Sequence, residues 1–247
     1  MRREAIIGPA VILALWALVS HVGLVDPLLL PGPEDVARRF IDLVTTRAVL
    51  ADLGWTVTRW ACGLCLGVAI GVPVGLLMGA SQRVYGALEA VVDYFRSIPV
   101  MAMFPLFLVF LGIGDQSKIA IAAWTSMLYM LINTLYGVRH VSETRRMVAR
   151  VFRATPWQTF AKVVFPEALP HIFVGMRISV SMSLVLVVAC EMVMGTTAGL
   201  GKRIFDAGLT YNMSEMYASI FLTGAVGYLS NKLFVTLERT VIHWATV

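Results

Sequence analysis

Residues Trp55–Met78 read WTVTRWACGLCLGVAIGVPVGLLM and decide the fold of this chain. The stretch is an apolar block of about 20 residues, the length that a helix needs to cross roughly 30 Å of hydrocarbon. Glycines recur at four-residue intervals in and just after the block. They therefore lie near one face of the predicted helix and allow a second helix to approach closely. This glycine ridge consists of Gly63, Gly67, Gly71, Gly75 and Gly79.

Similar apolar blocks occupy much of the remaining chain. Of its 247 residues, 58% are hydrophobic and 14% are charged, whereas a soluble domain carries about 25% charged residues. Lipid offers backbone amides no hydrogen-bond partner, so long apolar blocks satisfy them as helices. We predict an all-α membrane protein, one domain over residues 1–247 with six transmembrane helices. The predicted spans are residues 6–25, 55–78, 85–111, 119–138, 172–194 and 217–237.

The third predicted span contains features that interrupt a helix. It begins amphipathic, with Glu89, Asp93 and Arg96, and then becomes apolar around Pro99 and Pro105. A proline inside a helix removes one backbone hydrogen bond and collides with the preceding turn. We expect a kinked or broken helix in this region.

Charges on the connecting segments predict the orientation in the membrane. Between residues 138 and 171, six basic residues accompany only Glu143 and Glu167, whereas residues 26–54 hold three basic and five acidic residues. Loops rich in Lys and Arg remain on the cytoplasmic side. This rule places the loop 139–171 in the cytoplasm and residues 26–54 outside, and six crossings then place both termini inside. Helically spaced apolar residues in the external segment predict a short interfacial helix.

The cytoplasmic loop carries the strongest functional signal, because it leaves aromatic residues among cations. Thr155 is a good N-cap and Pro156 suits the first position of a helix, so a helix is predicted to begin here. Its apolar face would contain Trp157, Phe160, Ala161 and Val164. A groove on a partner protein or the membrane surface could receive this face, and the residues alone favour neither.

The loop resembles a known motif. Residues 156–170, PWQTFAKVVFPEALP, are similar to the second half of the EAA loop of bacterial ABC importer permeases. The resemblance extends over nearly the whole chain and is strongest with the taurine, alkanesulfonate and nitrate branch. The further matches are Leu30-Pro31-Gly32-Pro33, Gly71–Gly79, Arg96-Ser97-Ile98-Pro99, Phe110–Asp115, Ile132-Asn133-Thr134, Gly137-Val138, Cys190-Glu191-Met192, Gly199-Leu200-Gly201 and Leu237-Glu238-Arg239.

This resemblance implies a type I ABC importer permease fold in the bacterial inner membrane. It implies that the loop forms a coupling helix, which docks in a separate ATPase subunit that binds ATP and Mg²⁺. This chain would then be a transport subunit without a cofactor of its own. Two copies of the chain, two ATPase subunits and an external solute-binding protein would import a small anion such as a sulfonate or nitrate. The residues expected to couple to the ATPase are Arg150, Phe152, Arg153, Trp157, Phe160, Lys162 and Pro166.

The loop departs from the family pattern at two places. Met147-Val148-Ala149 stands where the family has Glu-Ala-Ala, and Arg153 stands where it has a glycine. A glycine would permit a bend between two short helices at positive φ, which an arginine adopts only with strain. Either the bend is made differently or the docking helix is more continuous.

Four residues are candidates for the translocation path or its gate. Glu191 is a charge inside an apolar block, which is costly unless it is paired or functional. It could face the path, gate it, or form hydrogen bonds to a neighbouring helix. Asn133 could join two helices by a hydrogen bond, and Arg96 could attract an anion or extend toward the headgroups. Pro99 marks the predicted break in the third span.

Other motifs in the chain carry no chemistry. Gly199-Leu200-Gly201-Lys202 is not a P-loop, because Thr196 and Arg203 replace its first glycine and its hydroxyl residue. Cys62 and Cys65 are interpreted as packing residues on one helix face, since no second Cys or His pair accompanies them. No residue cluster has the spacing of a metal site, and the basic residues form no stripe suited to nucleic acid.

Two other functional classes stay open as alternatives. An intramembrane enzyme acting on lipid would need several polar residues that converge at one depth, and only Glu191 lies clearly inside an apolar block. A carrier that is not driven by ATP usually contains inverted repeats, and none is evident in this sequence.

Overall fold

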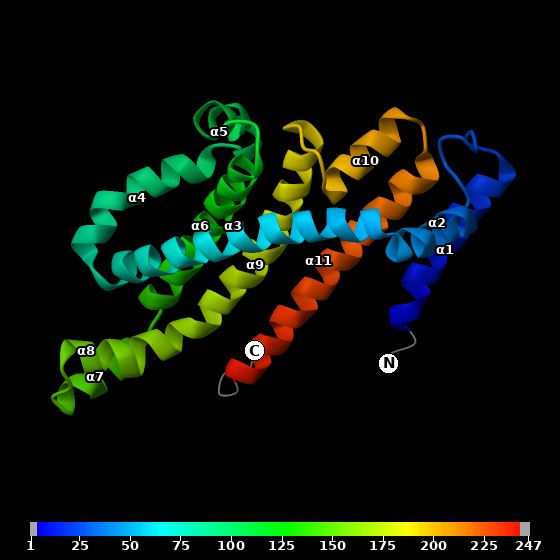
Figure 1. The fold of residues 1–247 in the computed structure, drawn as a ribbon. Helices are drawn as coiled ribbons and strands as arrows, with labels where there is room; N and C mark the ends of the chain where they lie inside the picture. Colours follow the sequence, from blue (N-terminus) through cyan, green and yellow to red (C-terminus); the bar gives the residue numbers. More distant parts are fainter. Residues whose placement is uncertain (1–3, 243–247) are drawn as a thin grey trace. The chain divides into compact units, whose positions relative to one another are not determined.

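The computed structural model describes residues 4–242, and every regular element in this range is helical (Figure 1). The prediction of an all-α protein is confirmed for this part of the chain. The elements are α1 (Glu4–Val22), α2 (Pro33–Thr45), α3 (Arg47–Ala80), α4 (Gln82–Ser97), the 3₁₀ helix η1 (Val100–Met103), α5 (Phe104–Leu111), α6 (Asp115–Arg139), α7 (Glu143–Val151), α8 (Pro156–Thr159), the π-helix η2 (Phe160–Val164), α9 (Phe165–Val193), α10 (Leu200–Leu209) and α11 (Met213–Val241).

Four helical stretches are long and apolar enough to cross a membrane. A fifth crossing exists if α4 and the pair η1–α5 form one broken span, which bends by 92°. The first apolar block forms α1, and its described apolar part, Ile7–Val22, is shorter than these spans. Residues 4–242 therefore contain four or five candidate spans, and the predicted six are not confirmed. The four unbroken spans are Arg47–Ala80, Asp115–Arg139, Pro156–Val193 and Met213–Val241.

The chain divides into two compact units, and the first comprises Met1–Thr56 and Glu191–Val226. Its core contains Val36 and Leu43 from α2, which confirms a short amphipathic helix in the segment after the first apolar block. The Trp16 ring stacks on Phe221, and its indole N–H donates to the Pro31 carbonyl at 3.1 Å. These contacts hold α1 and α2 against the start of α11.

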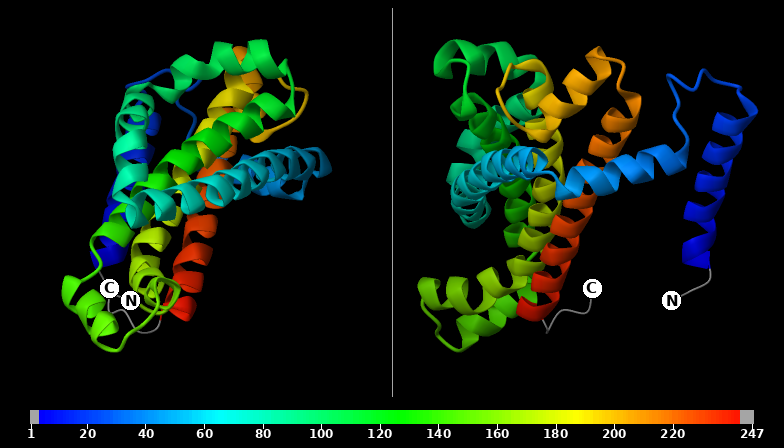
Figure 2. Two further views of the ribbon diagram at one scale, coloured as in Figure 1. Left: turned by 90° about the vertical axis from the view of Figure 1, so that its left-hand side faces the viewer. Right: turned by 45° about the vertical axis from the view of Figure 1, so that its right-hand side comes forward.

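The second unit comprises Val57–Cys190 and Gly227–Val247, and the glycine ridge organises it. A Cβ placed on Gly67 would lie 2.4 Å from the Ser126 Cβ and 2.6 Å from the Ala123 carbonyl oxygen. The other four glycines of the ridge also contact α6 at distances that no Cβ could occupy. Helices α3 and α6 therefore pack backbone against backbone where they cross (Figures 1 and 2). The predicted close helix approach is confirmed, with α6 as the partner.

The third predicted span is broken, as its prolines indicate. Helix α4 ends where Ile98 adopts an extended conformation with ψ 123°, the conformation that a following proline favours. Pro99 then precedes η1, and Pro105 lies in the first turn of α5, where its missing N–H costs nothing. The sharp bend thus follows from Pro99 rather than from Pro105.

Cys62 and Cys65 are exposed on α3, whereas Cys190 is buried. The predicted packing of these two residues does not occur inside this chain, because both are exposed. A helix surface of this kind is left for lipid or for another subunit.

Candidate functional site

The loop between α6 and α9 is built by the helix start that the sequence predicts. Thr155 caps α8, since its hydroxyl accepts the Gln158 N–H at 3.2 Å while the Gln158 side chain accepts the Thr155 N–H at 2.9 Å. Pro156 occupies the first helical position. This reciprocal capping box satisfies two amides that a helix start otherwise leaves without a partner.

The bend between α7 and α8 is made at Arg153, which adopts the left-handed conformation with φ 54°. The Arg153 N–H donates to the Arg150 carbonyl at 2.9 Å, and the Ala154 N–H donates to the Ala149 carbonyl at 3.0 Å. Together these bonds form a Schellman motif, whose left-handed position is normally a glycine. An arginine there costs about 1–2 kcal/mol. The bend is therefore made at Arg153 with strain, and the two alternatives predicted to avoid it are wrong.

An exposed apolar surface covers this loop. The side chains of Phe152 and Trp157 are 80% and 72% exposed, and Met147 and Val151 are exposed beside them. We call these four residues the docking patch. Large aromatic side chains exposed to this extent next to exposed Arg150, Arg153 and Lys162 fit an interaction site better than a solvated loop.

Phe160 does not belong to the docking patch. It is half-buried and packs against the buried cluster that includes Val164, and its ring lies 6.4 Å from the Phe165 ring. Trp157 stacks on Phe160 from outside, with 5.9 Å between the ring centroids. The predicted apolar face of α8 is therefore divided: its inner residues join the core of the second unit, and Trp157 remains available to a partner.

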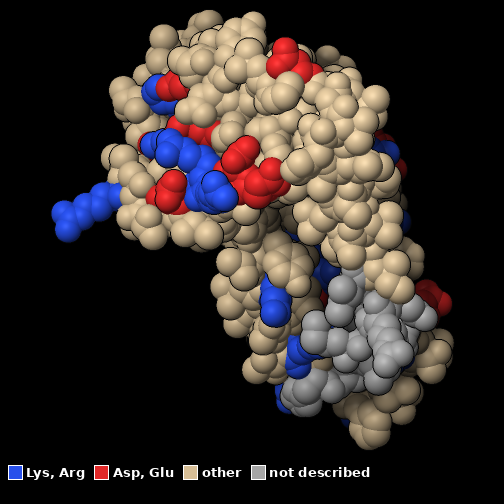
Figure 3. All heavy atoms as spheres, turned by 90° about the vertical axis from the view of Figure 1, so that its right-hand side faces the viewer, with Lys and Arg blue, Asp and Glu red and all other residues tan. Residues whose placement is uncertain are grey.

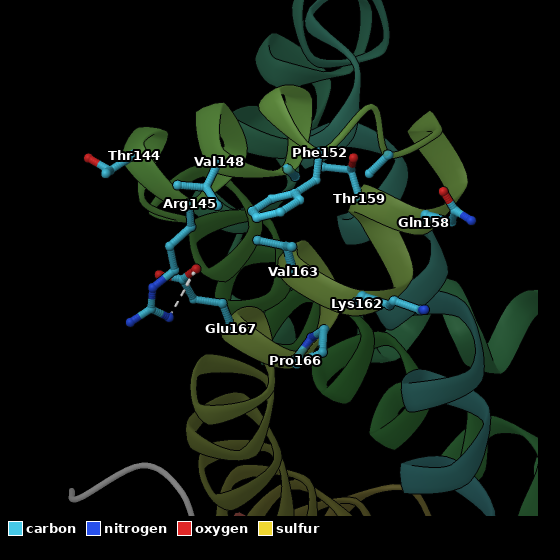
Figure 4. Close-up of a pocket in the computed structure, with 12 residues that line it drawn as sticks. Thr144, Arg145, Val148, Phe152, Gln158, Thr159, Lys162, Val163, Pro166 and Glu167 are labelled. Atoms are coloured by element: carbon cyan, nitrogen blue, oxygen red, sulfur yellow. Dashed lines mark ion pairs between the residues drawn. The ribbon is translucent and has the colours of Figure 1, made fainter.

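A groove of about 660 Å³ opens beside Phe152, between α7 and the segment from α8 to α9. In Figure 4 the Phe152 ring points over this groove toward Val148 and Val163. At its far wall the Arg145 guanidinium pairs with the Glu167 carboxylate at 3.4 Å. Lys162 lies on the opposite side of the groove, and Pro166 lies between Lys162 and Glu167 (Figure 4). Apolar side chains therefore form the centre of the groove, and charged groups lie at its border.

Two of the residues predicted for the path lie together at the break after α4. Arg96 and Pro99 line a groove of about 600 Å³ whose other walls come from α6 and α9, including Tyr129 and Met182. Arg96 is half-exposed and also pairs with Asp93 on its own helix at 3.1 Å. The groove is largely apolar with one cation at its edge.

Asn133 and Glu191 lie outside this groove. The Asn133 amide donates to the Tyr129 carbonyl of its own helix at 2.8 Å, so this bond does not join two helices. Glu191 is 1% exposed and belongs to the first unit. Its carboxylate accepts the Thr56 hydroxyl at 2.9 and 3.0 Å and the Gly201 N–H at 2.9 Å. Hydrogen bonding to neighbouring helices, one of the three predicted roles of Glu191, therefore occurs.

Three buried polar residues were not singled out by the sequence. Thr56 bonds to Glu191, the buried Arg59 donates to Asp115 at 2.7 Å, and the buried Lys118 donates to the Gly114 carbonyl at 3.0 Å. A charge inside or next to an apolar block was a usable signal for both cations. The hydrogen bond of Thr56 to Glu191 could not be predicted, because the two residues are far apart in the sequence.

Comparison with known proteins gives one family over most of the chain. The family described as "Binding-protein-dependent transport system inner membrane component" matches residues 71–242. A Bacillus subtilis permease protein named for aliphatic sulfonates transport is 32% identical over 241 residues, which cover 98% of this chain and 87% of that protein. The nitrate import permease protein of a Synechocystis strain is 30% identical and covers 94% of this chain and 86% of its own length.

Among solved structures, an inward-facing methionine ABC transporter contains a similar chain. Its TM-score is 0.69 at 24% sequence identity, and the match covers 78% of this chain and 96% of that one. At this identity the similarity shows the fold alone, which is that of an importer permease.

Proposed function

This chain belongs to the family of binding-protein-dependent transport system inner membrane components, and from that premise we propose that two copies of it form the path by which a small anion enters the cell. It is a multi-pass permease subunit of an ABC importer and not an enzyme. It works with an ATPase and with a solute-binding protein. The exposed pair Phe152 and Trp157 carries the proposal, because it gives the chain a place for the ATPase.

The ATPase docks on the loop 139–171. Interfaces are held by a few buried aromatic anchors, and charged residues around them orient the partner. Phe152 and Trp157 supply the anchors, and Arg150, Arg153 and Lys162 supply the surrounding charge. Pro166 shapes the groove beside Phe152. Phe160 contributes indirectly, by supporting the Trp157 ring from below.

A second copy of the chain is the favoured membrane partner. In the most apolar part of α11 only 6% of the residues are buried inside the chain, and in α3 only 33%. A permease that formed a path alone would bury more of its helices. The anion path then lies between two copies, with Arg96 and Pro99 of each copy at its wall and the break after α4 supplying irregular backbone.

The anion is a sulfonate or nitrate, the solutes for which the two similar permeases are named. Arg96 would attract either one. In cells or proteoliposomes with the assembled importer, Arg96→Gln is expected to lower uptake of labelled taurine or nitrate about tenfold, since a hydrogen bond to a charged group contributes about 1.5–3 kcal/mol. Arg83→Gln, on the same helix and outside the groove, should leave uptake unchanged.

The uptake assay also separates the functional classes. Uptake that needs ATP and stops without the ATPase supports the importer. Transport by the chain without an ATPase would make it a carrier, and turnover of lipid by the chain alone would make it an enzyme. If Arg96→Gln and Arg83→Gln lower uptake equally, Arg96 does not line the path.

The orientation follows from loop charge. We place α1 as an additional span, α2 and α10 outside, and the loop 139–171 with both termini inside. Within the second unit, the C-terminal end of α11 lies at the same end as α7 and α8 (Figure 2), which supports a cytoplasmic C-terminus.

Cysteine labelling checks this orientation. After Cys62 and Cys65 are replaced by serine, a membrane-impermeant maleimide added to intact cells should label Glu34→Cys and Lys202→Cys. It should not label Arg150→Cys until the membrane is opened. Labelling of Arg150→Cys in intact cells, with Glu34→Cys protected, would invert the orientation.

A further inference from the structure

The N-terminus of α10 is capped by side chains from two other helices. The first amides of a helix have no partner within it and carry the positive end of its dipole. Here three consecutive N–H groups donate to oxygen atoms of α3 and α9, at 3.0, 2.9 and 2.9 Å. The pairs are Gly199 with Asp52, Leu200 with Thr56, and Gly201 with Glu191.

Thr56 and Glu191 form the buried centre of this arrangement. The Thr56 hydroxyl donates to the Glu191 carboxylate and accepts the Leu200 N–H, so one oxygen links three helices. A Cβ on Gly199 would lie 2.5 Å from the Glu191 carboxyl carbon, and Gly199 has φ 140°. Only glycine fits so close to the carboxylate. We call Thr56, Glu191 and the segment 199–201 the cap joint.

A second set of contacts holds α10 independently of the cap joint. Arg203 donates to Asp52 at 2.6 Å and to Glu215 at 2.7 Å, and Arg39 also pairs with Glu215. Burial opposes the charge of Arg203, but its bonds to Asp52 and Glu215 outweigh burial and raise the pKa of its guanidinium. Figure 3 shows positive and negative side chains gathered in mixed groups of this kind. Loss of the Thr56 hydroxyl should therefore leave α10 attached.

The helix that carries Glu191 begins at the docking patch. Helical structure continues without a break from Pro156 to Val193, over 38 residues. Trp157 is its second residue, and Glu191 lies in its last turn. The docking patch and Glu191 are therefore joined by one helical stretch with no intervening loop.

We propose that Glu191 is a positioning residue, which passes the ATP-driven displacement of α9 to the external helix α10 through the cap joint. The proposal rests on the proposed function, because the ATPase docked at Trp157 is the source of the displacement. Residues 194–199 connect α9 to α10 but carry no regular helix. The side-chain bonds of the cap joint make that connection stiff, so that α10 follows α9 instead of lagging behind it.

Two variants remove the joint and a third preserves it. Thr56→Val keeps the volume but removes the hydroxyl, and Glu191→Gln keeps the size but removes the charge. Thr56→Ser retains the hydroxyl and is the matched control. The reporter is Leu209→Cys, at the exposed end of α10, in a chain with Cys62 and Cys65 replaced by serine.

The complex of this chain with its ATPase is studied in nanodiscs. The rate at which a maleimide labels Leu209→Cys is measured without nucleotide and with ATP, Mg²⁺ and vanadate. With Thr56 and Glu191 intact, the two rates should differ by at least about fivefold, the lower end of usual coupling between sites. Thr56→Ser should keep this ratio. Thr56→Val and Glu191→Gln should bring it close to one while ATP hydrolysis without the solute-binding protein is unchanged.

Each other outcome decides against one claim. The positioning role is overturned if Thr56→Val and Glu191→Gln keep the same ratio of labelling rates as the intact joint. It is also overturned if the intact joint gives equal rates with and without nucleotide while ATP is hydrolysed. Loss of the folded chain or of the ATPase in both variants would mean that the joint only maintains the fold, which also overturns it. If the intact chain binds no ATPase at all, the proposed function itself fails.

Discussion

Gly67→Val is expected to lower the unfolding free energy of the chain by about 3 kcal/mol or more, whereas Gly54→Val on the same helix should leave it nearly unchanged. The two glycines lie on the same helix and differ in what an added Cβ would contact. A Cβ on Gly67 would meet Ser126 Cβ at 2.4 Å, the Ala123 carbonyl at 2.6 Å and the Met127 amide at 2.8 Å. A Cβ on Gly54 would meet nothing within 4 Å.

The effect at Gly67 is large because two of its three neighbours are backbone atoms. A flexible side chain could move aside, but a carbonyl and an amide of α6 move only with the helix. Separation of α6 from α3 would also loosen the contacts of Gly63 and Gly71 on either side. The contacts of the whole ridge are therefore weakened together. Valine at this position should lower the unfolding free energy more than alanine.

Thermal unfolding of the chain in nanodiscs, followed by tryptophan fluorescence, measures this difference. For a chain of this size, 3 kcal/mol corresponds to a lower midpoint by roughly 6–12 °C. Equal midpoints for Gly67→Val and Gly54→Val would show that α3 and α6 are not in backbone contact.

The ridge illustrates what the sequence predicts well. A four-residue glycine period is a local property, so the close approach of a second helix could be predicted. The partner could not, because α6 contributes small residues such as Ala122, Ala123 and Ser126 that have no marked pattern of their own. Likewise Pro99 predicted the break after α4, and the angle of 92° depends on packing.

The number of crossings shows the limit of hydropathy. The block 55–78 lies inside a helix that runs from Arg47 to Ala80, because no proline or capping residue stops it at the predicted start. Hydropathy reports which residues contact lipid and not where a helix ends. A short α1 and a bent third region therefore leave four or five candidate spans where six were predicted.

The candidate site also has features that could be predicted from the sequence and features that could not. The start of α8 could be predicted, because Thr155 is a good N-cap and Pro156 suits the first helical position. The burial of Phe160 depends on α6 and α9, which pack against the loop, so an apolar face read from α8 alone was too wide. The bonds of Glu191 to Thr56 and Gly201 join residues that are 135 and 10 positions away, and only the folded chain brings them together.

Phe152→Ala and Trp157→Ala should each weaken ATPase binding by about 2 kcal/mol or more, which is roughly a thirtyfold change in Kd. Both side chains are largely exposed, so their loss should not unfold the loop. Phe110→Ala, which truncates an equally exposed phenylalanine on α5, is the matched control. Lys162→Ala should weaken binding less, and mainly at low salt.

Phe160→Ala should behave differently from the two anchors. It removes a half-buried ring that packs on the buried cluster that includes Val164 and lies near the Phe165 ring. We expect it to lower the stability of the loop as well as ATPase binding. A change in both quantities distinguishes a supporting residue from an anchor.

Recruitment of an ATPase through the docking patch can be read from the mass of the complex in nanodiscs. For the unaltered chain we expect a mass equal to two copies of the chain and two ATPase subunits. With Phe152→Ala and Trp157→Ala combined, the ATPase mass should disappear and the mass of the paired permease should remain. If the double variant retains both ATPase subunits, or if the unaltered chain stays a monomer without any ATPase, the docking patch does not recruit an ATPase.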